Sequence, residues 1–427
     1  MSFVQHLGSL ALTAKTIAPL MGARCVRSSE ALITNVQIDS RACTSGSLFF
    51  ALPGAHVDGF SFIGDAARNG AVAIVVDDRL AEAARGIVDV ALLAASDVLA
   101  ALQALATSYV AMHRSAKLIG ITGSVGKTTT KEALATILSA AGETAKTPGN
   151  YNSVYGLPLS VFSLSKESRW GVFELGIDHH GEMDQLVSLL RPDVALLTNI
   201  GISHLAQFGS TEATAKEKAK IFHPQVSQGF ITKDCTHRSL IEASASVALH
   251  SYSRTDIEAI DLGLGGWLLT YQGNRFSVRT VGKHLLEDVI GAIKVAESLG
   301  IDAKTIAFAL QNFAPIPGRT SVSRGAITIV DDTYNASLDS TASILGYLSA
   351  LSWQGAKRVV LGPMKELGSE SERAHRTIGS LLARSSFSQT YLYGKEMYAA
   401  REELKRHSYA GSLSWTESFE ELQERVG

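Results

Sequence analysis

A glycine-rich turn with a lysine and four threonines stands at residues 120–130, which read G-I-T-G-S-V-G-K-T-T-T. The apolar run at residues 117–121 predicts a buried strand before it, and the alanine and leucine spacing of residues 131–141 predicts a helix after it. Backbone N–H groups of such a turn and the positive end of the helix dipole attract phosphate, and the Lys127 ammonium can reach the outer phosphates. The Thr128 hydroxyl then stands where Mg²⁺ binds. The pattern is T-G-x-x-G-K-T rather than the strict G-x-x-x-x-G-K-[ST]. The strand, turn and helix nevertheless favour a polyphosphate site, for ATP, over a turn with a solvated lysine.

Two further polar side chains follow predicted strands. Glu174 lies at the end of the apolar run at residues 170–175, and His204 comes shortly after the run at residues 194–200. Taken alone, each is more typical of a surface or capping residue. Because ligands collect at the carboxyl ends of parallel strands, we expect both to join Thr128 around Mg²⁺. Oxygen ligands suit Mg²⁺ best, and a histidine is the less usual partner.

Three other polar groups have plain structural interpretations. A helix is predicted over residues 212–222, and composition alone favours a solvated cationic face for its three lysines, Lys216, Lys218 and Lys220. Residues 39–41 follow a predicted strand at residues 31–38 and read as a polar turn. Residues 149–152 (G-N-Y-N) precede an apolar helix and are suited to capping it.

Composition excludes several classes of function. The chain has 427 residues, is 46% hydrophobic and carries a formal net charge of −2, so it suggests two to four domains and offers no basic field for nucleic acid or anionic membranes. Its three scattered cysteines favour reduced thiols. The His179–His180 and Cys235–His237 pairs lack the further partners that zinc or a nucleophilic thiol needs. With no signal-peptide pattern and no run of about 20 apolar residues, we expect a cytoplasmic protein.

The order of the predicted elements favours an α/β fold with a mostly parallel sheet. Strands and helices alternate from residue 117 to about residue 300, and the rhythm restarts after a proline-containing linker at residues 314–319. Further strands are expected at residues 31–38, 47–52, 71–76, 229–232, 326–330, 357–361 and 388–393. Further helices are expected at residues 59–70, 97–114 and 287–299, the last of them ahead of residues 301–313. These elements divide the chain into domains at residues 1–108, 109–314 and 315–427.

Several stretches together resemble the Mur ligases of peptidoglycan synthesis. They occur in family order over about residues 36–380 and include T-G-S-V-G-K-T-T-T, G-N-Y-N-S-V-Y-G-L-P-L, F-E-L-G, T-N-I-G-I-S-H-L and A-K-E-K-A-K-I-F. Others resemble the family member that adds D-alanyl-D-alanine to a UDP-linked muramoyl tripeptide. These are D-S-R with S-L-F-F-A-L-P-G, G-I-D-H-H-G-E-M, D-D-T-Y-N-A-S and M-K-E-L-G.

The resemblance implies a small N-terminal α/β domain that holds the UDP moiety, a central P-loop ATPase domain, and a C-terminal Rossmann-like domain that closes over the nucleotide. The implied reaction is an ATP-dependent amide ligation through an acyl phosphate. Its cofactors are ATP and Mg²⁺, and its substrates are UDP-N-acetylmuramoyl tripeptide and D-alanyl-D-alanine. The resemblance also implies a monomer.

The resemblance assigns roles to residues by position. Phosphate binding falls to the turn and helix start: Gly123, Ser124, Val125, Gly126, Lys127, Thr128 and Thr129. The implied Mg²⁺ ligands are Thr128, Glu174, His204 and Lys218, the last as a carbamate. The implied nucleotide contacts from the third domain are Arg319, Asp332 and Asn335. Lys127, His204, Lys218 and Arg319 are thus the implied catalytic residues. Ser40 and Arg41 match the uridine side, and Asn150 and Asn152 match an asparagine pair that lines the substrate channel.

Two other functions remain open from the sequence. One is another Mur or folylpolyglutamate-type ligase, which would differ in the amine it accepts. The other is a Mur-like scaffold that binds a nucleotide or UDP-sugar without ligation, although a scaffold has no need to keep Lys127, Glu174 and Lys218 together. Leu285 and Asp288 stand where the family has Asn. Family members continue past the point where this sequence stops, so the resemblance implies a third domain without its last strand.

Overall fold

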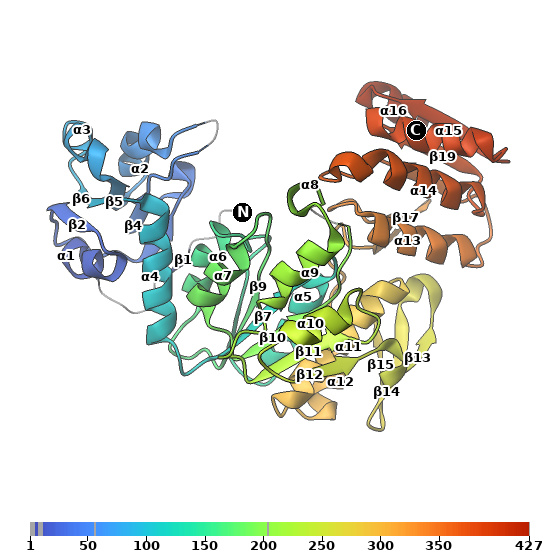
Figure 1. Ribbon diagram of the computed structural model, residues 1–427, viewed down its shortest axis with the longest axis horizontal. Helices are drawn as coiled ribbons and strands as arrows, with labels where there is room; N and C mark the ends of the chain where they lie inside the picture. Colours follow the sequence, from blue (N-terminus) through green and yellow to red (C-terminus); the bar gives the residue numbers. More distant parts are fainter. Residues whose placement is uncertain (1–4, 7–11, 55–56, 203–204, 427) are drawn as a thin grey trace.

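The computed structural model describes residues 5–6, 12–54, 57–202 and 205–426. Three domains follow one another along the chain, coloured blue, cyan to yellow, and orange to red in Figure 1. Each contains helices and a sheet with parallel strands, so the predicted α/β fold class is confirmed. No helix within the described ranges is both long and apolar enough to span a bilayer.

The first domain is built on a six-stranded sheet. Its elements are β1 (Gln5–His6), α1 (Ala14–Ile17), β2 (Arg24–Arg27), β3 (Asn35–Gln37), β4 (Ser47–Phe50), α2 (Ile63–Arg68), β5 (Ala71–Asp77), α3 (Ala81–Arg85) and β6 (Ala91–Ala95). The sheet order is β1-β3-β4-β5-β6-β2, with β3 to β6 parallel and the two edge strands antiparallel. The strand predicted at residues 31–38 is shorter, because Ile33 makes only an isolated bridge with Leu12.

Helix α4 (Val98–Met112) connects the first domain to the second. The Asp97 side chain caps it by accepting a hydrogen bond from the Ala100 N–H at 3.0 Å. Ser108 Oγ donates to Leu20 O in the first domain, and Tyr109 Oη donates to Leu164 O in the second. The buried face of α4 therefore belongs to one hydrophobic core that both domains share, and Figure 1 shows α4 standing between them.

The middle domain has a six-stranded sheet in which every strand is parallel. Its order is β12-β11-β10-β7-β9-β8. The strands are β7 (Lys117–Thr122), β8 (Thr144–Lys146), β9 (Trp170–Glu174), β10 (Val194–Leu197), β11 (Gln228–Thr232) and β12 (Leu249–Tyr252). The helices are α5 (Lys127–Ser139), α6 (Gly156–Ser160), α7 (Glu182–Leu190), α8 (Leu205–Phe208), α9 (Thr211–Ala219), α10 (Arg238–Ser244), α11 (Lys283–Ser298) and α12 (Ala303–Gln311).

A three-stranded antiparallel sheet interrupts this pattern. It consists of β13 (Glu258–Asp261), β14 (Trp267–Tyr271) and β15 (Asn274–Val278), and no strand was expected there. Trp267, Leu269 and Phe276 bury its inner face in the same core as α5 and α11. The sheet therefore extends the core on the α11 side of the domain.

The third domain has two separate sheets. Its elements are β16 (Ser321–Arg324), β17 (Thr328–Asp331), α13 (Leu338–Ala350), β18 (Arg358–Leu361), α14 (Ser371–Ala383), β19 (Gln389–Tyr393), α15 (Tyr398–Arg406), β20 (Ser412–Thr416) and α16 (Phe419–Val426). β16 and β17 form an antiparallel ribbon, whereas β18, β19 and β20 form a parallel sheet. A core of its own packs between this sheet and helices α13 to α15.

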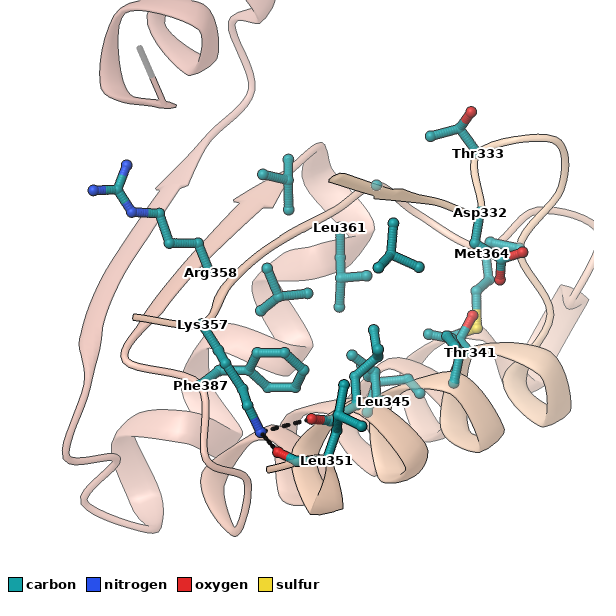
Figure 2. Close-up of a pocket in the computed structure, with 18 of the residues that line it drawn as sticks. Asp332, Thr333, Thr341, Leu345, Leu351, Lys357, Arg358, Leu361, Met364 and Phe387 are labelled. Carbon is teal, nitrogen blue, oxygen red and sulfur yellow. Dashed lines mark hydrogen bonds between the residues drawn. The ribbon is translucent and has the colours of Figure 1, made fainter. Parts of the chain in front are cut away.

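A cavity of about 590 Å³ lies between β17 and β18 (Figure 2). Val330, Leu361 and Leu345 give it an apolar lining. At one end the Lys357 ammonium donates hydrogen bonds to Leu351 O (2.5 Å) and Leu348 O (2.8 Å), near the end of α13. Among the described strands, β17 pairs only with β16 and β18 only with β19, so this cavity separates the two sheets.

Candidate active site

The predicted phosphate loop connects β7 to α5, and two of its glycines have a left-handed backbone. Gly123 has φ 151° and Gly126 has φ 87°. A Cβ on Gly123 would lie 1.9 Å from Thr198 Oγ1, and a Cβ on Gly126 would lie 2.1 Å from Asp288 Oδ1. Only glycine fits both positions. Their backbone thus opens the N-terminus of α5, where N–H groups and the helix dipole favour an anion.

We expect Gly126→Ala to weaken nucleotide binding and to destabilise the protein. The left-handed backbone alone costs a non-glycine residue about 1–2 kcal/mol, and the Asp288 contact adds to this. Urea unfolding and calorimetric titration with ADP measure the two effects. Gly181→Ala is a matched control, because Gly181 has φ 86° and nothing lies within 4 Å of its added Cβ. Equal losses in the two variants would contradict the steric argument.

Residues directly after β10 brace the loop, and the sequence analysis did not identify them. Asn199 Oδ1 accepts a hydrogen bond from Val125 N (3.0 Å), and Asn199 Nδ2 donates to Val125 O (3.1 Å). Thr198 Oγ1 also donates to Val125 O, at 2.5 Å. Their position at a strand end, like that of Glu174, was the signal that could have found them. The loop is thereby fixed before any phosphate binds.

Lys127 begins α5 and lies over the loop. Its ammonium donates hydrogen bonds to Gly123 O (2.7 Å) and Ser124 O (3.4 Å). Burial lowers the pKa of Lys127, and the nearby Glu174 carboxylate opposes that shift. The cation is held at the loop, where it can exchange the backbone carbonyls for phosphate oxygens.

Glu174 and Thr128 meet beside the loop as predicted. Thr128 Oγ1 donates to Glu174 Oε2 at 3.4 Å, and Asn152 Nδ2 donates to the same oxygen at 3.2 Å. A hydroxyl and a carboxylate form the hard-oxygen donor set that suits Mg²⁺. No three His, Cys, Asp or Glu side chains of the described chain are grouped to hold a metal by themselves, so phosphate oxygens would complete such a site. The predicted ligand His204 lies outside the described residues.

Lys218 is buried on α9, with 1% of its surface exposed. Burial holds the pKa of Lys218 well below its usual range, and the positive charge of Lys127 lowers it further. The solvated interpretation is therefore wrong for Lys218. The solvated interpretation holds for Lys216, whose side chain is exposed and pairs with Glu212. The Lys220 ammonium forms ion pairs with Glu217 and Asp184. Burial beside the Lys127 charge thus favours the unprotonated amine of Lys218.

A small pocket lies between the phosphate loop and the third domain. Arg319, Asp332 and Asn335 line it together with Gly126 and Thr128. The Arg319 guanidinium stacks 4.0 Å from the centre of the Tyr334 ring, and Arg319 Nε is buried with no hydrogen-bond partner in the described chain. Asp332 Oδ1 accepts from Thr320 N at 2.9 Å, and burial raises the pKa of Asp332. The structure thus brings the predicted third-domain residues to the loop.

Two residues of α11 also face this region. Asp288 is 5% exposed and adjoins Gly126; burial raises its pKa well above the usual range. His284 lines the pocket, and its Nδ1 lies 3.0 Å from Ser343 Oγ of α13. This contact joins the middle domain to the third. Burial lowers the pKa of His284 to about 4, so the imidazole is neutral at physiological pH.

We expect stability to decrease on acidification because of His284. Between its unfolded pKa of about 6.5 and its folded pKa of about 4, the unfolded chain binds the extra proton. The contribution is present in full above pH 6.5 and decreases as the pH falls, by at most about 1.4 kcal/mol per pH unit. Urea unfolding from pH 7.5 to 4 should show a shallower pH dependence for His284→Gln than for the wild type. Parallel curves would contradict this assignment.

The predicted substrate residues lie in two places. Ser40 and Arg41 form a short 3₁₀ turn in the first domain (Ser40–Ala42), where Asp39 caps the turn and pairs with Arg41. Asn69 Nδ2 donates to Ser40 O at 2.9 Å. This is the turn chemistry expected from the sequence, and it leaves the Arg41 guanidinium mostly exposed. Asn150 is exposed on a loop of the middle domain.

Comparison with known proteins agrees with this organisation. Family models match most of the chain in three consecutive segments. They are described as Mur ligase family, catalytic domain (residues 32–118), Mur ligase middle domain (residues 121–296) and Mur ligase, glutamate ligase domain (residues 318–426).

Similar curated proteins carry one name, UDP-N-acetylmuramoyl-tripeptide–D-alanyl-D-alanine ligase. The protein of Treponema pallidum is 35% identical over 426 residues, covering 96% of this chain and 91% of the relative. That of Escherichia coli is 30% identical and covers 88% of this chain and 84% of the relative.

Solved structures agree as well. MurF from Acinetobacter baumannii superposes with a TM-score of 0.86 at 28% identity, covering 97% of this chain and 91% of that one. MurF from Thermotoga maritima in complex with ADP gives a TM-score of 0.74 at 27% identity, covering 92% and 90%. With three matched domains and relatives aligned over nearly their full length, this chain belongs to the Mur ligase family.

Proposed function

We propose that this protein is the ligase that joins D-alanyl-D-alanine to UDP-N-acetylmuramoyl tripeptide, with cleavage of ATP to ADP and phosphate. The proposal rests on the names of its relatives. The observation in the structure that carries it is the phosphate loop, with Lys127 over it and Glu174 and Lys218 buried nearby. That set is suited to phosphoryl transfer from a nucleotide.

The chemistry follows from the weakness of a carboxylate as an electrophile. The terminal carboxylate of the tripeptide attacks the γ-phosphorus of ATP, which gives an acyl phosphate and releases ADP. The amine of D-alanyl-D-alanine then attacks the acyl carbon, forms the amide, loses a proton and expels phosphate. The loop N–H groups, Lys127 and Arg319 bind the charge on the transferring phosphoryl group, and positioning supplies most of the catalysis.

The proposed metal site uses Thr128 and Glu174, with His204 and Lys218 for a second ion. A bound Mg²⁺ supplies neutralisation of phosphate charge. Lys218 is proposed to react with CO₂ and so become a carbamate, which exchanges a cation for a carboxylate-like ligand. Only an unprotonated amine undergoes this reaction, and burial of Lys218 favours that form. The carbamate would also offset the Lys127 charge.

The remaining assignments concern the substrates and the domains. We propose that Ser40 and Arg41 bind the uridine side of the substrate, that Asn150 and Asn152 line its channel, and that Asp332 and Asn335 contact the nucleotide with Arg319. We also propose domain limits at residues 1–108, 109–314 and 315–427, and a monomeric state. A cytoplasmic location is proposed because ATP is an intracellular nucleotide. The first limit falls within α4.

The test is phosphate release from ATP in the presence of UDP-muramoyl tripeptide, with and without D-alanyl-D-alanine. Release that requires both substrates, together with an amide product identified by mass, is the expected result. Release with a different amine, such as glutamate, would instead indicate another Mur or folylpolyglutamate-type ligase. Substrate binding without release would indicate a scaffold.

A further inference from the structure

Lys131 is a fully buried cation one helical turn after Lys127 on α5. It has no exposed surface, which is unusual for a lysine unless its charge is paired. Neither the phosphate loop nor the proposed metal ligands include it. Its contacts therefore need their own explanation.

Three oxygens surround the Lys131 ammonium. It donates to Thr147 O at 2.9 Å, and lies 2.8 Å from Glu132 Oε1 and 3.3 Å from Glu174 Oε1. The contacts to Glu132 and Glu174 are ion pairs, so two carboxylates compensate the charge of the buried ammonium. Glu132 in turn pairs with Lys146 nearer the surface. A line of alternating charges thus leads inward from Lys146 to Glu174.

The two oxygens of Glu174 face different partners. Oε1 forms an ion pair with the Lys131 ammonium at 3.3 Å and accepts no hydrogen bond within the described chain. Oε2 accepts from Thr128 Oγ1 and Asn152 Nδ2, on the side of the phosphate loop. The backbone of Glu174 is fixed as well, because its N–H donates to Thr147 Oγ1 at 2.9 Å. The carboxylate is therefore oriented from both ends.

We propose that Lys131 is a positioning residue that presents Glu174 to the cation of the bound nucleotide. This rests on the Mg²⁺ site of the proposed function. Lys131 holds Oε1 away from the loop and leaves Oε2 as the single ligand oxygen. It also compensates the buried carboxylate charge and keeps the carboxylate in place when no cation is bound. Partners behind a metal ligand commonly change metal affinity about 10- to 100-fold.

The test separates Mg²⁺ binding from nucleotide binding. Calorimetry measures the affinity of the protein for ADP in EDTA and again over a series of Mg²⁺ concentrations. For Lys131→Met we expect the apparent Mg²⁺ affinity of the ADP complex to fall about 10- to 100-fold. The ADP affinity in EDTA should stay close to that of the wild type, because Lys131 does not contact the phosphate loop. A merely structural role would lower the melting temperature without this selective change.

Lys146→Met is the matched control, since it removes the outer cation of the same line of charges and should leave the Mg²⁺ dependence unchanged. Lys131→Gln keeps a donor without the charge and replaces Lys131→Met if that variant does not fold. A folded Lys131 variant with wild-type Mg²⁺ dependence would overturn the proposal. If the ADP affinity of the wild-type protein does not change with Mg²⁺ concentration, the proposed metal site is wrong, and the role of Lys131 is wrong with it.

Discussion

Replacing Lys127 by alanine should slow ligation at least about 100-fold and leave binding of the UDP substrate intact. The Lys127 ammonium is the cation held over the phosphate loop, so its loss removes charge stabilisation where the phosphoryl group transfers. Removing one such preorganised donor costs about 100- to 1,000-fold in kcat. Phosphate release measures the first effect, and calorimetric titration with UDP-muramoyl tripeptide measures the second.

The control is Lys117→Ala, at the start of β7, the strand that precedes the phosphate loop. Its side chain is mostly exposed and lies 3.9 Å from Asp193, so activity should not change. Simultaneous loss of ligation and UDP-substrate binding in Lys127→Ala would contradict the assignment of the two sites to different domains.

Lys218→Ala should lower kcat on the order of 100-fold or more, because it removes the proposed carbamate, a charged ligand at the reacting centre. If Lys218 acts as a carbamate, a short carboxylate such as formate can enter the space left by the truncated side chain and supply the missing oxygen ligand. We therefore expect formate to restore part of the lost activity. Phosphate release over a range of formate concentrations measures this recovery.

Lys216→Ala is the comparison on the same helix, since Lys216 is exposed and pairs with Glu212. It should keep full activity and gain nothing from formate. Mass measured on the intact protein under CO₂-saturated, mildly basic conditions provides a second readout. The absence of both formate rescue and a carbamate mass would refute the carbamate role.

The sequence was most informative where local rules determine the structure. The strand, turn and helix around Lys127 were predicted because glycine spacing and apolar runs are local signals. The buried state of Lys218 was not predictable in this way, because K-E-K-A-K places charges around the whole helix. It is buried by packing against segments distant in the sequence, which no single stretch reveals.

The antiparallel sheet of β13 to β15 was missed for a different reason. Its second hairpin turns at Gln272 and Gly273, which both have positive φ, as a type I′ turn requires. Glutamine is not among the residues that usually mark such a turn, so the signal was weak. The small pocket between the phosphate loop and the third domain, by contrast, depends on how Arg319 and Asp332 lie against that loop. That arrangement is tertiary.

The shared core around α4 determines how this protein can be divided. Leu102 and Leu105 of α4 lie in one cluster with Leu48 of the first domain and Leu157 of the middle domain. A fragment cut between residues 108 and 109 would break the helix and expose this apolar surface to water, which favours aggregation. The third domain has its own core. Recombinant fragments, and exchanges of domains between homologues, should therefore separate the chain at the proline-containing linker and keep the first two domains together.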